Sequence, residues 1–213
     1  MFGRYAVLLT DTDGAIGTGF IVASPDGPKL ITTAHLAGSR PASDDWSKWR
    51  PSISVHGVGF KVTMPLFDPV GRPLFSYLSM LPPGQVHDVI SLTLDTETRL
   101  SLDDLGWPAV VELLTDLPSP GDPVTAYGCM RHGSEGKVAL MEREGVALPS
   151  EHPLYGRSTL KTVPGHSGGP VFDKAGALCG VMVGYEDDSS IIIGSRLISH
   201  LASQGEPGDA LGR

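Results

Sequence analysis

Seven residues in the second half of the chain, Pro164–Pro170, read Pro-Gly-His-Ser-Gly-Gly-Pro and could present a reactive hydroxyl group. The serine of this stretch, Ser167, stands among three glycines, which permit a tight turn and leave room for a substrate backbone. A serine attacks a carbonyl when a base takes its proton, a third group orients that base, and N–H groups face the developing oxyanion. The stretch therefore directs attention to a histidine and an acid elsewhere in the chain.

One of the seven histidines stands in a sequence frame that suits a general base. His35 ends the segment Leu30–His35, an apolar strand that runs into small residues able to pack beneath an imidazole. Among the acids, Asp88 directly precedes the apolar strand expected at 89–94, so we expect its carboxylate to be partly buried and to need a partner. His35, Asp88 and Ser167 follow one another in one of the known chain orders of a Ser-His-Asp site.

Three motifs together make the sequence similar to the trypsin-like, chymotrypsin-fold serine peptidases. Residues 17–22 followed by Thr33–His35 resemble the histidine block of that family, His87–Leu94 its aspartate block, and Gly165–Pro170 its serine block. Each motif alone is weak, but all three occur in the family's order and together span nearly the whole chain. In style the sequence is similar to bacterial intracellular members that lack disulfides.

The resemblance implies a serine endopeptidase that cleaves protein or peptide substrates through an acyl-enzyme, with no cofactor and no metal. It implies His35 as general base, Asp88 as the residue that orients it, Ser167 as nucleophile, and the N–H groups of Gly165 and Ser167 as oxyanion hole. Singly, these residues could be a core histidine, a strand-entry acid and a turn serine. The fold could also serve as a peptide-binding or regulatory module without turnover, although the complete set of motifs favours the enzyme.

The residues that would set substrate preference are less clear. In the family, the primary pocket is bordered by the residues before the oxyanion glycine and by the strand after the serine hairpin, which here are Lys161, Thr162, Val163, Met182, Val183, Gly184 and Tyr185. Lys161 lies six residues before Ser167, where an acid gives trypsin-like enzymes their preference for Lys and Arg, so it argues against tryptic specificity. A Lys161 that points to solvent would instead leave a mixed apolar pocket.

A second resemblance concerns acidic substrates. The stretch Thr162–Gly165 is similar to glutamate-preferring bacterial members, but these carry a histidine on the following strand, and Val181–Gly184 has none. An acidic or an apolar preference therefore stays open.

His166 stands directly before the candidate nucleophile, where secreted relatives carry an aspartate. In those relatives the aspartate pairs with an N-terminal amine that is released when the zymogen is cleaved. Here the first strand is expected to begin at Tyr5, and a histidine cannot offer that carboxylate. We therefore expect the loop to be held by its own backbone and neighbours, with activity present as synthesised or gated by a regulatory partner. We expect His166 itself to be a surface residue packed over the loop.

Composition bounds the class of protein. The 213 residues are 40% hydrophobic, which suits a globular protein, and the net charge of −8 argues against nucleic acid or an anionic membrane as partner. Two cysteines, Cys129 and Cys179, are few for an extracellular member of the family, so we expect free thiols and a cytoplasmic location. The N-terminal segment does not resemble a signal peptide, and no apolar run reaches membrane-spanning length.

Many short strands separated by glycine and proline predict an all-β protein. The family fold implies two six-stranded antiparallel β-barrels with the site in the cleft between them. We expect residues 1–108 to hold the first barrel and the start of the connection, residues 109–203 the second barrel and a short C-terminal helix, and residues 204–213 a frayed tail. Trp46 and Trp49 are expected in a surface loop that folds back onto the first barrel.

Overall fold

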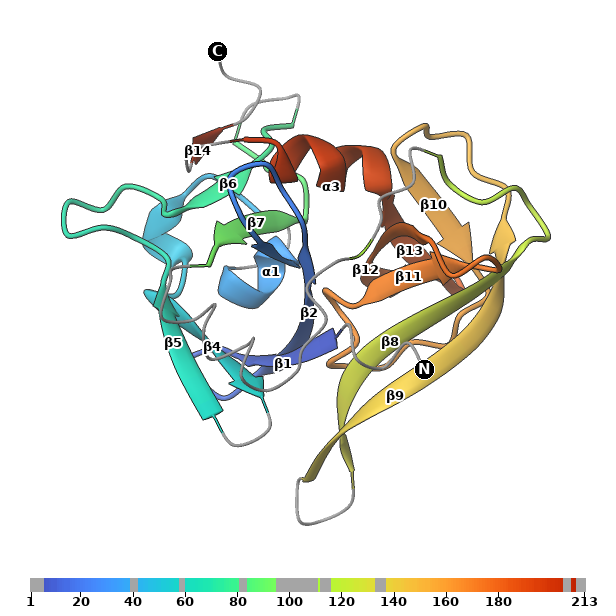
Figure 1. Ribbon diagram of the computed structural model, residues 1–213, viewed down its shortest axis with the longest axis horizontal. Helices are drawn as coiled ribbons and strands as arrows, with labels where there is room; N and C mark the ends of the chain where they lie inside the picture. The colour runs from blue at the N-terminus through green and yellow to red at the C-terminus, as the bar shows by residue number, and fades with distance from the viewer. Residues whose placement is uncertain are drawn as a thin grey trace.

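Short strands with apolar faces form two β units that lie side by side (Figure 1). The first half of the chain forms one unit and the second half the other, except that a short strand at residues 208–209 joins the first unit. The computed structural model describes residues 6–38, 42–57, 60–80, 84–94, 111, 116–132, 137–204 and 208–209. Most of the expected connection between the units, after residue 94, lies outside these ranges. The all-β, chymotrypsin-like arrangement is the one that the motifs implied.

The first unit is an eight-stranded sheet in the order β14-β6-β7-β3-β2-β1-β4-β5. Neighbouring strands are antiparallel except β14 and β6, which run parallel. Its strands are β1 (Ala6–Thr10), β2 (Ile16–Val22), β3 (Lys29–Thr32), β4 (Ser52–Gly57), β5 (Phe60–Pro65), β6 (Phe75–Tyr77), β7 (Ile90–Thr93) and β14 (Gly208–Asp209). Within the described residues the sheet is not closed by strand pairing, which differs from the six-stranded barrel expected for this half.

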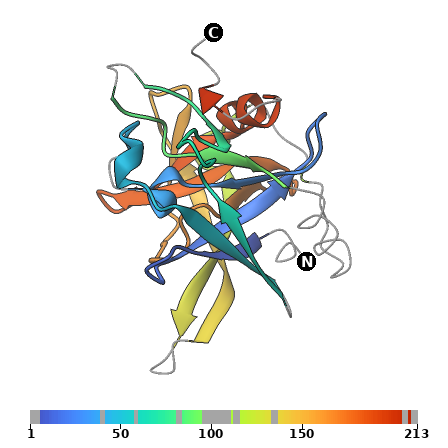
Figure 2. The ribbon, with the colours of Figure 1, turned by 90° about the vertical axis from the view of Figure 1, so that its left-hand side faces the viewer.

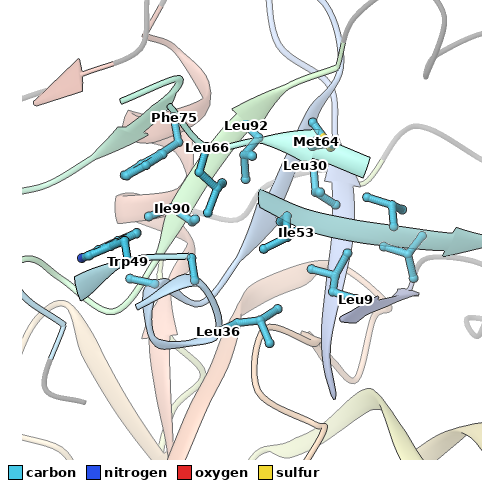
Figure 3. Packing of buried hydrophobic residues seen from close by; sticks show 14 of the residues in the cluster. Leu9, Leu30, Leu36, Trp49, Ile53, Met64, Leu66, Phe75, Ile90 and Leu92 are labelled. Atoms are coloured by element: carbon cyan, nitrogen blue, oxygen red, sulfur yellow. The ribbon is translucent and has the colours of Figure 1, made fainter. Parts of the chain in front are cut away.

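The core of the first unit is filled by aliphatic side chains from several strands and by aromatic rings (Figure 3). Leu9, Leu30 and Ile53 point into this core and are almost fully buried. Trp49 stacks on Phe75 with ring centroids 4.9 Å apart and an interplanar angle of 7°. The tryptophan-containing segment thus packs onto the sheet as predicted, where it contributes buried aromatic area.

The second unit is a closed barrel in the order β10-β13-β12-β11-β8-β9. Its strands are β8 (Pro123–His132), β9 (Lys137–Leu148), β10 (Tyr155–Ser158), β11 (Pro170–Asp173), β12 (Leu178–Glu186) and β13 (Ser189–Gly194). Arg157 opposite Leu148 closes the barrel between β10 and β9. The far ends of β8 and β9 form a hairpin that projects from the body of the molecule in both views (Figures 1 and 2).

Three short helical segments complete the described structure: α1 (Ala34–Ala37), the 3-10 helix η2 (Trp46–Lys48) and α3 (Ser195–Ala202). The predicted C-terminal helix is therefore confirmed. Leu197 and Ile198 of α3 join a core cluster that also contains Phe20 and Ile31 of the first unit. This shared cluster connects the two units. None of the described helices is long and apolar enough to cross a membrane.

Candidate active site

His35 and Asp88 meet in the first unit. His35 lies in α1, one turn of helix that follows β3, and not at the end of a strand. Its Nδ1 lies 2.7 Å from Asp88 Oδ2, and its backbone N–H donates to Asp88 Oδ1 at 2.9 Å. The two side chains are only 14% and 26% exposed. One carboxylate therefore fixes both the backbone and the ring of His35.

This contact decides which ring nitrogen carries the proton. A carboxylate oxygen accepts hydrogen bonds, so Nδ1 of His35 must donate to Asp88. In the neutral ring the lone pair then sits on Nε2. Nε2 is thus the atom of His35 that can accept a proton.

Ser167 lies on a turn whose shape requires glycine. Gly165 and Gly168 have φ values of +101° and +87°, a region that favours glycine. A Cβ atom at Gly165 would collide with the carbonyl of Cys129, and one at Gly168 with the carbonyl of Thr18. The glycines on both sides of Ser167 therefore allow this loop to pack tightly against β2 and β8.

Thr18 of β2 anchors the same loop from the other unit. It is fully buried, and its backbone N–H donates to the carbonyl of Ser167 at 2.8 Å. Its hydroxyl donates to the carbonyl of Gly165 at 2.6 Å and accepts from the N–H of Cys129 at 2.8 Å. This role of Thr18 was not predicted, although a threonine between two glycines in an apolar strand is the signal that could have identified it.

A cleft of about 470 Å³ brings the predicted residues together. It is lined by Ile16, His35, Thr162, Val163, Pro164, Gly165, Ser167, Met182, Gly184 and Tyr185. Two residues that were expected to border it are not among them. Val183 is buried in the core that the two units share, and Lys161 is exposed in a separate hollow beside Glu142 and Glu144. In this structure the side chain of Lys161 therefore lines a hollow other than the cleft.

His166 is buried, so the prediction of a surface residue is wrong. Its exposed fraction is 2%, and among the described residues no partner reaches either ring nitrogen. The ring packs against Gly128 of β8, where an added Cβ would come within 2.5 Å of it. Burial, together with the charge of Arg143, lowers the pKa of His166 to about 4. At neutral pH the residue before Ser167 is therefore an uncharged ring beneath the loop.

A second histidine forms a bond between the two units beside Asp88. His87 Nδ1 lies 2.6 Å from the hydroxyl oxygen of Tyr155 in β10. Burial and the charge of Asp88 raise the pKa of Tyr155 to about 12, while burial and His152 lower the pKa of His87. At neutral pH Tyr155 therefore keeps its proton and His87 is uncharged, and the tautomer of the imidazole decides which of the two groups donates.

Both cysteines are free, as predicted, and the structure shows that both are buried. Burial raises the pKa of the Cys129 thiol to about 11 and that of the Cys179 thiol to about 12. A thiol that stays protonated at neutral pH is a poor nucleophile. Ser167 therefore has no competitor from the cysteines.

Comparison with known proteins places this site in a family. The family described as trypsin-like peptidase domain matches residues 17–181. The chain belongs to this family. No curated protein sequence matches this trypsin-like peptidase.

Solved structures share the fold of this trypsin-like peptidase at low sequence identity. The Rv3671c protease of M. tuberculosis, in an inactive form, is 16% identical with a TM-score of 0.60, covering 93% of this chain and 87% of that chain. The serine protease domain of the Sesbania mosaic virus polyprotein is 20% identical with a TM-score of 0.61, covering 92% and 90%. The human astrovirus serine protease is 17% identical with a TM-score of 0.56, covering 91% of each chain. These similarities agree with the fold that the motifs implied.

Proposed function

We propose that this trypsin-like peptidase is a serine endopeptidase in which His35 is the general base, Asp88 orients it and Ser167 is the nucleophile. The observation that carries the proposal is the double contact of one Asp88 carboxylate with His35, in a cleft that Ser167 also lines. A hydrogen-bonded carboxylate and histidine could be structural, but this histidine lines the same cleft as a serine on a glycine turn. That combination is the one that acyl transfer requires.

The proposed reaction follows from the hydrogen bonds of the site. His35 Nε2 takes the hydroxyl proton as Ser167 Oγ attacks the substrate carbonyl, and Asp88 stabilises the imidazolium that forms. The N–H groups of Gly165 and Ser167 receive the oxyanion. His35 then gives its proton to the leaving amine, and the acyl-enzyme remains on Ser167. Water then attacks the ester while His35 takes a proton from it, and His35 returns that proton to Ser167 Oγ as the acid product leaves.

A second cavity that adjoins the cleft supports cleavage within a chain rather than at its end. This cavity, of about 490 Å³, lies beside the cleft and shares Ile16, Val163 and Pro164 with it. An extended substrate that fills the cleft can therefore continue past Ile16, Val163 and Pro164 into the second cavity. That arrangement suits protein or internal peptide substrates.

Labelling by a fluorophosphonate tests the proposal, because the probe reacts with an activated serine. The wild type and a Ser47→Ala control, which alters an exposed serine far from the cleft, should be labelled and should cleave a casein or peptide-library substrate. Ser167→Ala should lose labelling and lower turnover by about 10⁶-fold. Near-normal turnover in Ser167→Ala would overturn the assignment. Peptide binding without labelling of the wild type would instead support a binding module.

A further inference from the structure

The polar groups of the cleft indicate which side chain it accepts before the cleaved bond, an inference that rests on the proposed peptidase function. Val163 and Met182 provide apolar surface, and Thr162 provides a hydroxyl group. Apolar walls with few polar groups fix a ligand through the direction in which those groups donate or accept. Whether the Thr162 hydroxyl donates or accepts therefore determines which ligand group can pair with it.

A chain of two hydroxyls determines that direction. Ser190 of β13 is fully buried, and its hydroxyl donates to the carbonyl of Leu160 at 2.6 Å. A serine hydroxyl has one proton, and a carbonyl can only accept, so the proton of Ser190 is committed. Thr162 Oγ1 lies 3.1 Å from Ser190 Oγ. Thr162 must therefore be the donor in this second bond.

The consequence is that Thr162 offers lone pairs, and no proton, to a ligand in the cleft. Ser190 lies behind it without exposed surface, whereas Thr162 is partly exposed and lines the cleft. A ligand group that donates a hydrogen bond can pair with Thr162. A carboxylate would face an acceptor with another acceptor, which leaves a desolvated charge unpaired.

The polar groups at the mouth of the cleft also favour a ligand that donates hydrogen bonds. The Tyr185 hydroxyl lies 3.4 Å from Asp188 Oδ1, a long contact in which the carboxylate can only accept. Asp187 and Asp188 form the turn between β12 and β13, with φ values of +47° and +58°, and so add negative charge beside Tyr185. Lys161, the cation nearest to the cleft in sequence, lies in the separate hollow described above.

We propose that the cleft selects an uncharged side chain with N–H donors, a glutamine-type carboxamide, and rejects an acidic one. The carboxamide NH₂ donates to Thr162, while its methylene groups pack against Val163 and Met182. Lysine and arginine fit less well, because Asp187 and Asp188 lie in the turn beyond Tyr185 and no carboxylate is among the described lining residues, so a cation inside the cleft would lose water without a partner there. The pocket thus resolves the choice left open by Thr162–Gly165 against an acidic substrate.

Four peptides that differ only in the residue before the cleaved bond test this selection. Glutamine should exceed glutamate by on the order of 100-fold in kcat/KM, since a site built for one hydrogen-bonding pattern discriminates strongly against its reverse. Methionine should fall between them, and lysine below methionine. Glutamate or lysine as the best substrate would overturn the proposal. Calorimetric binding of the same peptides to Ser167→Ala should give the same ranking, so the selection can be judged even if turnover is absent.

Two variants separate the hydroxyl chain from general packing. Thr162→Val keeps the shape but removes the acceptor, so glutamine should lose its advantage over methionine. Ser190→Ala removes the group that holds the Thr162 proton, so discrimination against glutamate should fall about tenfold. Ser189→Ala, a neighbouring serine that bonds to Glu186 and Arg157 instead, is the matched control and should keep the wild-type ranking. Unchanged discrimination in a folded Ser190→Ala protein would show that the hydroxyl chain is not its source.

Discussion

At the scale of single residues, the contact between Asp88 and His35 carries the most testable consequence. Asp88→Asn should preserve the fold, because the amide is the same size as the carboxylate and can still accept from the backbone N–H of His35. Its NH₂ group would then face Nδ1 and force the ring proton onto Nε2, which could no longer accept a proton from Ser167. We expect kcat/KM to fall by roughly 10⁴-fold, the size of this effect in the serine peptidase template.

The matched control for that experiment is Asp26→Asn, which changes an exposed turn residue after β2 and leaves net charge equal in the two variants. Steady-state hydrolysis of one fluorogenic peptide gives both values. A loss of less than tenfold in Asp88→Asn would mean that another acid orients His35.

At the scale of elements, the loop that carries Ser167 is held by buried groups from both β units. Thr18 satisfies two of its carbonyls with a backbone and a side-chain bond, and His166 fills the space above Gly128. No N-terminal ammonium is needed to satisfy a neutral ring. The neutral His166 thus gives the loop a different internal support from the aspartate of secreted relatives.

Burial of a neutral histidine makes stability depend on pH in a defined direction. The pKa of His166 is about 4 in the folded protein and about 6.5 in an unfolded chain, so the unfolded state binds the proton more readily. The contribution of the neutral His166 to the free energy of unfolding is therefore fully present above pH 6.5 and is lost as the pH falls toward 4. From pH 7.5 to pH 5, the free energy of unfolding should decrease by about 2 kcal/mol from this residue.

Urea denaturation at the two pH values measures this effect. His166→Asn, which cannot be protonated, should lose about 2 kcal/mol less than the wild type between pH 7.5 and pH 5. His152→Asn replaces an exposed histidine and is the comparison for general effects of pH. Equal losses of unfolding free energy in the wild type and His166→Asn would show that the pKa of His166 is the same in the folded and the unfolded protein.

The strands with strong apolar patterns were predictable from the sequence. The pattern over residues 137–148 predicts a long strand or a hairpin arm, and β9 spans these residues. The hairpin after Ser167 is present as β11 and β12. Helix α1 was missed because four residues are too few to show a helical period. Strand β10, Tyr155–Ser158, was missed because its glycine and polar side chains carry no alternating pattern.

The site was predictable to the extent that it depends on local motifs. The approach of His35 to Asp88 was predicted from two motifs, whose order along the chain matches one known order of a Ser-His-Asp site. The orientation of Lys161 could not be read, because it lies in an irregular segment after β10 where no period fixes the side chain. The partner of Ser190, the carbonyl of Leu160, is 30 residues away in sequence, and only the folded barrel brings them together.

At the scale of the whole molecule, the candidate site exists only while the two β units stay docked, because His35 and Asp88 come from one and Ser167 from the other. A shared core that contains Phe20, Ile31 and residues of α3 lies between the units. This apolar contact is nondirectional, so it holds the units together without fixing their relative position finely. Directional hydrogen bonds across the interface are suited to that second task.

The bond from Tyr155 to His87 is one such contact, and it lies next to Asp88. Tyr155→Phe removes the hydroxyl group and leaves Nδ1 of the partly buried His87 ring without its partner, so the free energy of unfolding should fall by about 1–2 kcal/mol. A small shift of His87 would move Asp88, and with it His35, so kcat/KM should fall about tenfold. Ser167 should still be labelled by the fluorophosphonate, but at a lower rate. Chemical denaturation, steady-state hydrolysis and the labelling rate measure the three effects.

His87→Leu and the double variant complete a double-mutant cycle. If the hydrogen bond positions the site, the double variant should be hardly worse than either single variant. Additive losses would instead mean that the two residues act independently and that docking of the units is set by the apolar core alone.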